Sequence, residues 1–166
     1  MAFHVHPPIV TAIAVGAILA LDTWVPQASV FFPGQRVIGG AVAVAGVLLV
    51  LWAVGHFRRS STTILPDRLD ERAAEMTTLM TDGPFAYSRN PIYLGMALLV
   101  TGAGLGVGSL AAPFVLAAFV WFIQTRQIVP EERVLRTRFG VEFDRYAAHV
   151  NRWIGRRRQG VGATPA

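Results

Sequence analysis

The stretch that decides the fold of this chain is Ile92–Gln127, which reads IYLGMALLVTGAGLGVGSLAAPFVLAAFVWFIQTRQ. It carries no charged residue before Arg126, and the small pair Gly108-Ser109 divides it into two apolar runs. Each run approaches the roughly 20 residues that a helix needs to cross a bilayer. The stretch therefore predicts two membrane-spanning helices, 92–107 and 110–127, joined by a tight turn into an antiparallel hairpin.

Two more apolar runs, 9–25 and 37–56, precede this hairpin. Of the 166 residues, 53% are hydrophobic and only 15% are charged, against roughly 25% charged in an ordinary soluble domain, and the mean hydropathy is +0.46. No Lys/Arg-rich region precedes the first run, so it is predicted to be retained rather than cleaved as a signal peptide. The predicted fold class is an all-α integral membrane protein with four transmembrane helices and a cytoplasmic amphipathic C-terminal helical segment.

The C-terminal segment 130–154 places apolar residues at three- and four-residue steps with Arg and Glu between them. That pattern predicts amphipathic helices, broken at Gly140, lying on the membrane face or over the bundle. Residues 159–166 are predicted to be a disordered end. Residues 1–158 are then a single membrane domain with one long polar loop, 57–91.

The distribution of arginine predicts the orientation. Only Arg36 lies between the first two runs, whereas all the other arginines lie in 57–91 or from Arg126 onward. Positive residues favour the cytoplasmic side, so both termini and the polar loop are predicted to be cytoplasmic. The net charge of +5 comes with no Lys; anionic lipid headgroups explain it better than nucleic acid does, and an Arg-, Ala- and Gly-rich chain indicates a bacterial inner membrane protein.

Glycines predict how the helices pack. Gly102/Gly106 and Gly104/Gly108 are overlapping small-xxx-small pairs, which allow helix backbones to approach closely in lipid. Gly95 lies beside a polar cluster, and there we expect the missing side chain to leave room for a ligand.

Polar residues gather at both ends of the hairpin that face the cytoplasm. The segment 82–95 enters the third span and the segment 126–133 leaves the fourth. Because the two spans form a hairpin, both segments are expected at the same membrane face.

The chemistry of these residues suits a small ligand with an anionic and a cationic end. Asn90 and Pro91 predict a helix start whose N–H groups favour an anionic group, and Arg89 adds a fork for a carboxylate or phosphate. Glu131 and Glu132 offer negative charge for a cation, or acceptors for ribose hydroxyls. Structural salt bridges or topological anchors are the alternative interpretation of the same residues.

The motif GPFAYSRNPIYLG at Gly83–Gly95, followed by Glu131-Glu132 and by FGVEFDRY at Phe139–Tyr146, resembles the isoprenylcysteine carboxyl methyltransferase family and the related phospholipid N-methyltransferases. The resemblance covers residues 62–153 and includes a Thr-x-x-Pro segment at Thr63–Pro66. It departs from the family pattern at Asn90, where the family usually has His. Asn cannot titrate near neutral pH, so no general base is expected at this position.

The resemblance implies S-adenosylmethionine as the cofactor, no metal, and a lipophilic or lipid substrate that enters from the bilayer. It implies methyl transfer to a carboxylate oxygen or a lipid amine. The oligomeric state is not predicted. The cofactor-binding residues that it implies are Gly83, Tyr87, Arg89, Asn90, Pro91, Tyr93, Gly95, Glu131 and Glu132. Arg89, Glu131 and Glu132 are the expected catalytic residues, and Arg126, Tyr146 and Arg152 are expected to bind the substrate.

Two other functions stay open. Sterol reductases that use NADPH have a similar Arg-His-Pro-x-Tyr element, but are much larger. A small transporter needs an ionisable group within the membrane, and Asp22 is the acidic residue that a span offers.

Overall fold

The computed structural model describes residues 6–24, 30–60 and 78–156. The Thr63–Pro66 segment and the end at 159–166 lie outside these ranges. Within them the chain is helical and has no strand; Val150 and Arg156 form an isolated bridge. The helices, in chain order, are α1 Pro7–Trp24, α2 Gln35–Ser60, the 3-10 helix η2 Gly83–Ala86, α4 Pro91–Val107, α5 Ala112–Ile123, the π-helix η3 Gln124–Ile128, α6 Val129–Phe139 and α7 Val141–His149.

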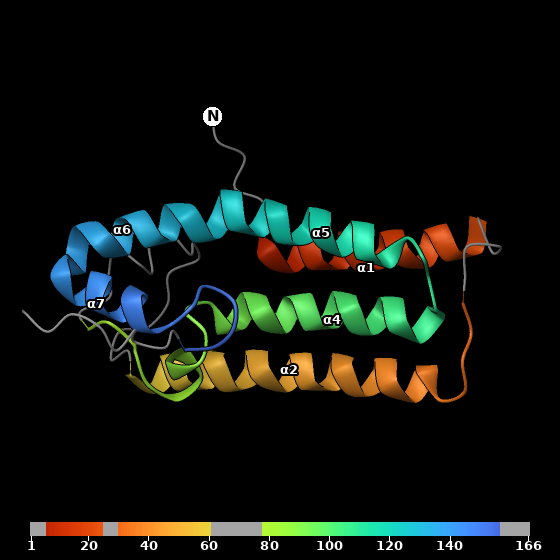
Figure 1. The fold of residues 1–166 in the computed structure, drawn as a ribbon, viewed down its shortest axis with the longest axis horizontal. Helices are drawn as coiled ribbons and strands as arrows, with labels where there is room; N and C mark the ends of the chain where they lie inside the picture. Colours follow the sequence, from red (N-terminus) through yellow and green to blue (C-terminus); the bar gives the residue numbers. More distant parts are fainter. Residues whose placement is uncertain (1–5, 25–29, 61–77, 157–166) are drawn as a thin grey trace, which may run out of the picture.

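Four of these helices form an elongated bundle in which α4 contacts α1, α2 and α5. α2 ends and α4 begins at one end of the bundle, which we call the polar end; the turn at Gly108 closes the opposite end (Figure 1). α6 continues α5 beyond the polar end, and α7 folds back along it (Figure 1). The chain thus has an apolar body and a polar extension.

In the part of the chain that the structure describes, three helices are long and apolar enough to cross a membrane: Pro7–Trp24, Gln35–Arg59 and Ala112–Phe139. The third predicted span is the shorter apolar helix α4, with 17 residues. At about 1.5 Å per residue it covers roughly 25 Å, against a hydrocarbon core of about 30 Å. Pro91 begins this helix and Gly108, with φ 70°, ends it, so the sequence itself sets the short length.

The fourth predicted span does not end near residue 127. Helical backbone continues from α5 through η3 into α6, with the N–H of Val129 donating to the carbonyl of Gln124 as in a π-helix. Pro130 follows directly and has no N–H to donate, and the wider π turn before it accommodates the lost bond. The helix then ends at Gly140, with φ 48°, a conformation that glycine adopts readily.

Glycine lets α2 and α4 approach through their backbones. A Cβ added to Gly102 would lie 2.6 Å from the carbonyl oxygen of Gly39, which confirms close helix contact at this glycine. A Cβ on Gly95 would lie 2.7 Å from the carbonyl oxygen of Gly46 and 2.6 Å from Val50. The space beside Gly95 is therefore filled by α2, which corrects the expectation of room for a ligand there.

Two apolar clusters form the interior. The larger lies between α1, α4 and α5, around Ile18, Val100 and Ile123. The smaller joins α7 to the segment before η2, through Phe143, Tyr146, Leu79 and Val150. The amphipathic C-terminal segment therefore packs on the polar end of the bundle.

Candidate functional site

The loop between α2 and α4 enters the polar end at Asp82 and Gly83. Gly83 has φ 54°, and a Cβ there would lie 2.9 Å from the His56 ring. The His56 Nε2 lies 2.9 Å from Asp82 Oδ1, and this hydrogen bond lowers the pKa of Asp82 below its usual value. The end of α2 is thus tied to the start of η2.

Glu132 is the buried centre of the site. Its carboxylate accepts a bidentate pair from Arg152, with Nη2 at 2.7 Å and Nε at 3.0 Å. The Nη2 atom of Arg89 lies 3.3 Å from Oε1 of the same carboxylate. The side chains of Glu132 and Arg89 are 7% and 9% exposed, whereas that of Arg152 is 38% exposed. The hydrogen bond with Glu132 raises the pKa of Arg152. Two guanidinium groups thus share one carboxylate.

Glu131, the neighbouring carboxylate, has a different partner. The hydroxyl of Tyr93, in the first turns of α4, donates to Glu131 Oε1 at 2.6 Å. Tyr93 is buried in the main apolar cluster. The two adjacent glutamates therefore face different surroundings: Glu132 faces guanidinium groups and Glu131 faces the start of α4.

A short segment after α7 covers the loop before α4; we call residues 151–155 the strap. The two residues that flank it, Val150 and Arg156, form a bridge. The Arg89 N–H donates to Asn151 O at 3.0 Å, and the Gly155 N–H donates to Tyr87 O at 2.8 Å.

Side chains fasten the same segment. The Asn90 Nδ2 donates to the carbonyl of Arg152 at 3.1 Å, and the Ser88 hydroxyl donates to it at 3.3 Å. The Trp153 Nε1 donates to Gln124 Oε1, in η3, at 3.0 Å. The strap thus joins the loop before α4 to η3 at the polar end.

Tyr146 anchors α7 to η2. Its hydroxyl donates to Phe85 O at 2.7 Å. Burial raises the pKa of this phenol well above its usual range, with a smaller lowering effect from Arg89 and a smaller raising effect from Glu132. Tyr146 is therefore a neutral hydrogen-bond donor at physiological pH, with a structural contact rather than an exposed hydroxyl.

Four of the residues predicted from sequence meet through these contacts: Arg89, Asn90, Glu132 and Arg152. Tyr93 and Glu131 form a second pair at the same end, and Tyr146 bonds to Phe85 O. Pro91 begins α4 beside them.

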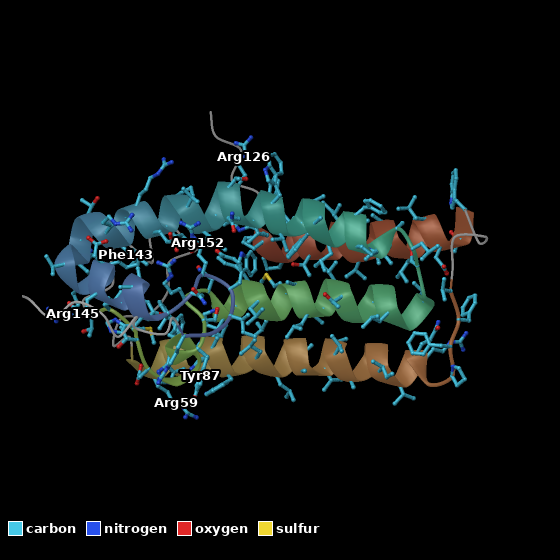
Figure 2. The ribbon with its side chains drawn as sticks, viewed as in Figure 1. Arg59, Tyr87, Arg126, Phe143, Arg145 and Arg152 are labelled. Atoms are coloured by element: carbon cyan, nitrogen blue, oxygen red, sulfur yellow. The ribbon has the colours of Figure 1, made fainter. Side chains whose placement is uncertain are left out.

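Two others lie apart. Arg126 is exposed and points away from the bundle on the outer side of the long helix (Figure 2). Tyr87 is 61% exposed, with the Arg156 guanidinium 5.5 Å above its ring. Arg126 misses the site because helical phase, and not proximity in sequence to Glu131, decides where its side chain points.

Sequence reasoning missed the anchors of the strap. Ser88 and Asn151 carry no signal beyond their polarity, since their roles depend on backbone partners more than sixty residues away. His56 and Asp82 lie 26 residues apart in sequence, and Gly83, with φ 54°, directly follows Asp82 where the two side chains meet.

The charge of the site can serve a ligand with both signs. Two arginines against Glu132 leave a local excess of one positive charge, and Glu131 supplies a carboxylate nearby. The first turn of α4 has no side-chain cap from Asn90, so its N–H groups face the same end. Within the described residues, no group of three or more His, Asp or Glu is arranged to hold a metal.

Both polar segments of the site lie in a stretch of the chain that is similar to known proteins. The phospholipid methyltransferase family matches residues 35–142, which run from α2 through Glu131-Glu132 to the start of α7. A relative from Schizosaccharomyces pombe, protein-S-isoprenylcysteine O-methyltransferase, is 29% identical over 72 residues, which is 43% of this chain. That stretch is 30% of the relative's own length. No solved structure matches. Since the family match spans most of the chain and contains both polar segments, the chain belongs to the phospholipid methyltransferase family.

Proposed function

We propose that this chain is an integral membrane methyltransferase that uses S-adenosylmethionine and acts on a lipophilic or amphiphilic acceptor. The observation that carries the proposal is the meeting of Arg89, Glu132 and Arg152 with Tyr93 and Glu131 at one end of an apolar bundle. Membership in the phospholipid methyltransferase family supports it. It also favours methyl transfer over the reductase and transporter alternatives.

The donor set fits this cofactor. S-adenosylmethionine has a carboxylate and an amino group at one end and ribose hydroxyls further along. Arg89 and the N–H groups at the start of α4 suit the carboxylate. Glu131 suits the amino group or the ribose, while Glu132, held by two arginines, acts as their counter-ion.

Methyl transfer from a sulfonium needs positioning more than covalent help, because the bound cofactor supplies an already activated methyl group. The residues of this chain would bind the cofactor's polar end, orient it and exclude water. The Tyr93–Glu131 hydrogen bond fixes the carboxylate at the start of α4. No residue of the site is required as a nucleophile.

The membrane arrangement belongs to the same proposal. We take α4 as a fourth, short crossing beside the three long helices, with the polar end and both termini in the cytoplasm of a bacterial cell. The acceptor then reaches the polar end laterally from the bilayer. Transfer to an oxygen atom is supported by the name of the fission yeast relative, an isoprenylcysteine O-methyltransferase, and a phospholipid acceptor by the name of the family.

Calorimetry on the detergent-solubilised protein tests the cofactor. We expect S-adenosylmethionine to bind the wild-type chain, and Arg89→Ala and Glu131→Ala to weaken binding by about tenfold or more, as for a lost charge-assisted hydrogen bond. Arg126→Ala is the matched control, because this arginine is exposed and points away. Absence of binding to the wild type, or equal binding by all variants, would overturn the proposal.

A further inference from the structure

The strap lies beyond the residues that the family match covers, which end at residue 142. It is nevertheless in direct contact with the polar residues of the site. Arg152 lies beneath α6 at the polar end of the bundle (Figure 2), and its guanidinium holds Glu132. A segment outside the matched region is therefore part of the site.

We propose that the strap is a positioning element that holds Arg89 in place through Asn151 and Arg152. The inference rests on the proposed function, in which Arg89 binds the cofactor. Asn151 accepts the Arg89 backbone N–H at 3.0 Å. Arg152 reaches the Arg89 side chain indirectly, because both guanidinium groups contact the Glu132 carboxylate. Two consecutive strap residues thus hold both the backbone and the side chain of one arginine.

Arg152 sets the orientation of the shared carboxylate. Its contacts with Glu132 are bidentate at 2.7 to 3.0 Å, whereas the Arg89 Nη2 lies 3.3 Å from Oε1. A bidentate guanidinium–carboxylate pair is planar and restricts rotation of the carboxylate. The carboxylate of Glu132 therefore presents Oε1 to Arg89 in an orientation that Arg152 imposes.

Asn90 and Ser88 place Arg152 in turn. Both side chains donate to the Arg152 carbonyl, at 3.1 and 3.3 Å, and Asn90 is buried. The Asn90 side chain is thus a donor to the strap and acts on the site through Arg152. A histidine ring N–H can donate to a carbonyl in the same way, whereas an aspartate at this position would face the carbonyl with no donor.

Four variants test this chain of contacts: Arg152→Gln, Asn90→Asp, Asn90→His and Arg156→Ala. The last is the control, because the Arg156 side chain contacts Ala86 O and the Tyr87 ring but not Glu132. One measurement is independent of any ligand, namely hydrogen exchange of the Arg89 amide in detergent micelles. The other is the dissociation constant of S-adenosylmethionine by calorimetry.

Arg152→Gln and Asn90→Asp are expected to weaken binding by about tenfold or more and to speed exchange of the Arg89 amide by a similar factor. Asn90→His and Arg156→Ala are each expected to keep both values within about twofold of the wild type, because each preserves the Arg152 contacts. Should Arg152→Gln fail to fold, the Asn90→Asp and Asn90→His pair gives the same test.

Two results would overturn the inference. One is wild-type exchange and binding in both Arg152→Gln and Asn90→Asp. The other is a lowered melting temperature in these variants with an unchanged dissociation constant, which is what a merely structural strap produces. If the wild type binds no S-adenosylmethionine while the exchange results follow the expected pattern, the proposed function fails and the positioning of Arg89 by the strap stands.

Discussion

Two regions of the molecule hold their elements together by opposite means. One is the contact between α2 and α4, and the other is the polar end. Along α2 and α4 the helices meet because side chains are missing: glycines let backbone approach backbone, with Gly39 and Gly102 in direct contact. At the polar end the elements meet because long side chains reach across, with Glu132 between Arg89 and Arg152. Lipid around a helix removes most of the hydrophobic drive for association, so shape holds the first region, and paired charges hold the second.

Non-helical backbone lies at the ends of the bundle. Between its ends the body of the bundle is helical in the described ranges; the turn at Gly108 lies at one end, and η2, the π turn of η3, the break at Gly140 and the strap lie at the polar end. Non-helical backbone needs other partners for its N–H and C=O groups. The Tyr146 hydroxyl and the Asn90 amide supply such partners.

Removal of the buried anion is expected to have the largest effect. Glu132→Gln leaves the guanidinium groups of Arg89 and Arg152 without their shared carboxylate, and breaking a buried ion pair in this way costs about 3–5 kcal/mol. Chemical unfolding in detergent micelles measures the loss. Asp144→Asn is the control: its pair with Arg136 is more than half exposed on both sides, and such a pair contributes roughly 0–1 kcal/mol. Equal effects of the two variants would remove the distinction between buried and exposed charges here.

A methyl group in the glycine contact tests the other region. In Gly39→Ala the added Cβ would lie 2.5 Å from Gly106 N and 2.6 Å from Gly102 O, and overpacking of this kind costs about 1–3 kcal/mol. Gly40→Ala is the control, since nothing lies within 4 Å of its Cβ. It should be neutral or slightly stabilising, because alanine is the better helix former. Thermal unfolding of the pair decides; a stable Gly39→Ala protein would mean that α2 can move away from α4 at no cost.

Loss of one hydrogen bond at the polar end is expected to cost less. Tyr146→Phe removes the donor to Phe85 O and keeps the packed ring, so the free energy of unfolding should fall by about 1 kcal/mol. Phe143→Leu is the comparison variant, because it changes the packing and removes no hydrogen bond. Unchanged stability in Tyr146→Phe would show that water or another donor replaces the phenol.

The smallest effect is expected from the exposed pair between His56 and Asp82. Because its pKa is lowered in the folded protein, the Asp82 carboxylate stabilises the fold above its unfolded pKa, and this contribution disappears as the pH falls through the folded value. The pair is largely exposed at Asp82, so the contribution is under about 1 kcal/mol. Melting temperatures of the wild type and Asp82→Asn, compared between about pH 6 and pH 2.5, should converge at the acid end. A constant difference over this range would show that ionisation of Asp82 has no part in the contact.

The sequence by itself determined the apolar, all-helical character, the hairpin around Gly108, the break at Gly140 and the two polar segments. Each of these depends on local composition, periodicity or a residue with special backbone freedom, so no distant partner is needed to see it. The close contact at Gly102 also follows from spacing alone.

Only the tertiary structure decided which polar groups meet. Glu131 and Glu132 are adjacent in sequence, yet one faces Tyr93 and the other faces two arginines; α2 takes the space beside Gly95. The partners of Glu132 lie 20 and 43 residues from it, and that of Asn90 lies 62 residues away. Hydrogen bonds and ion pairs act over about 3 Å with strict directions, and no local pattern specifies which distant groups will come within that reach.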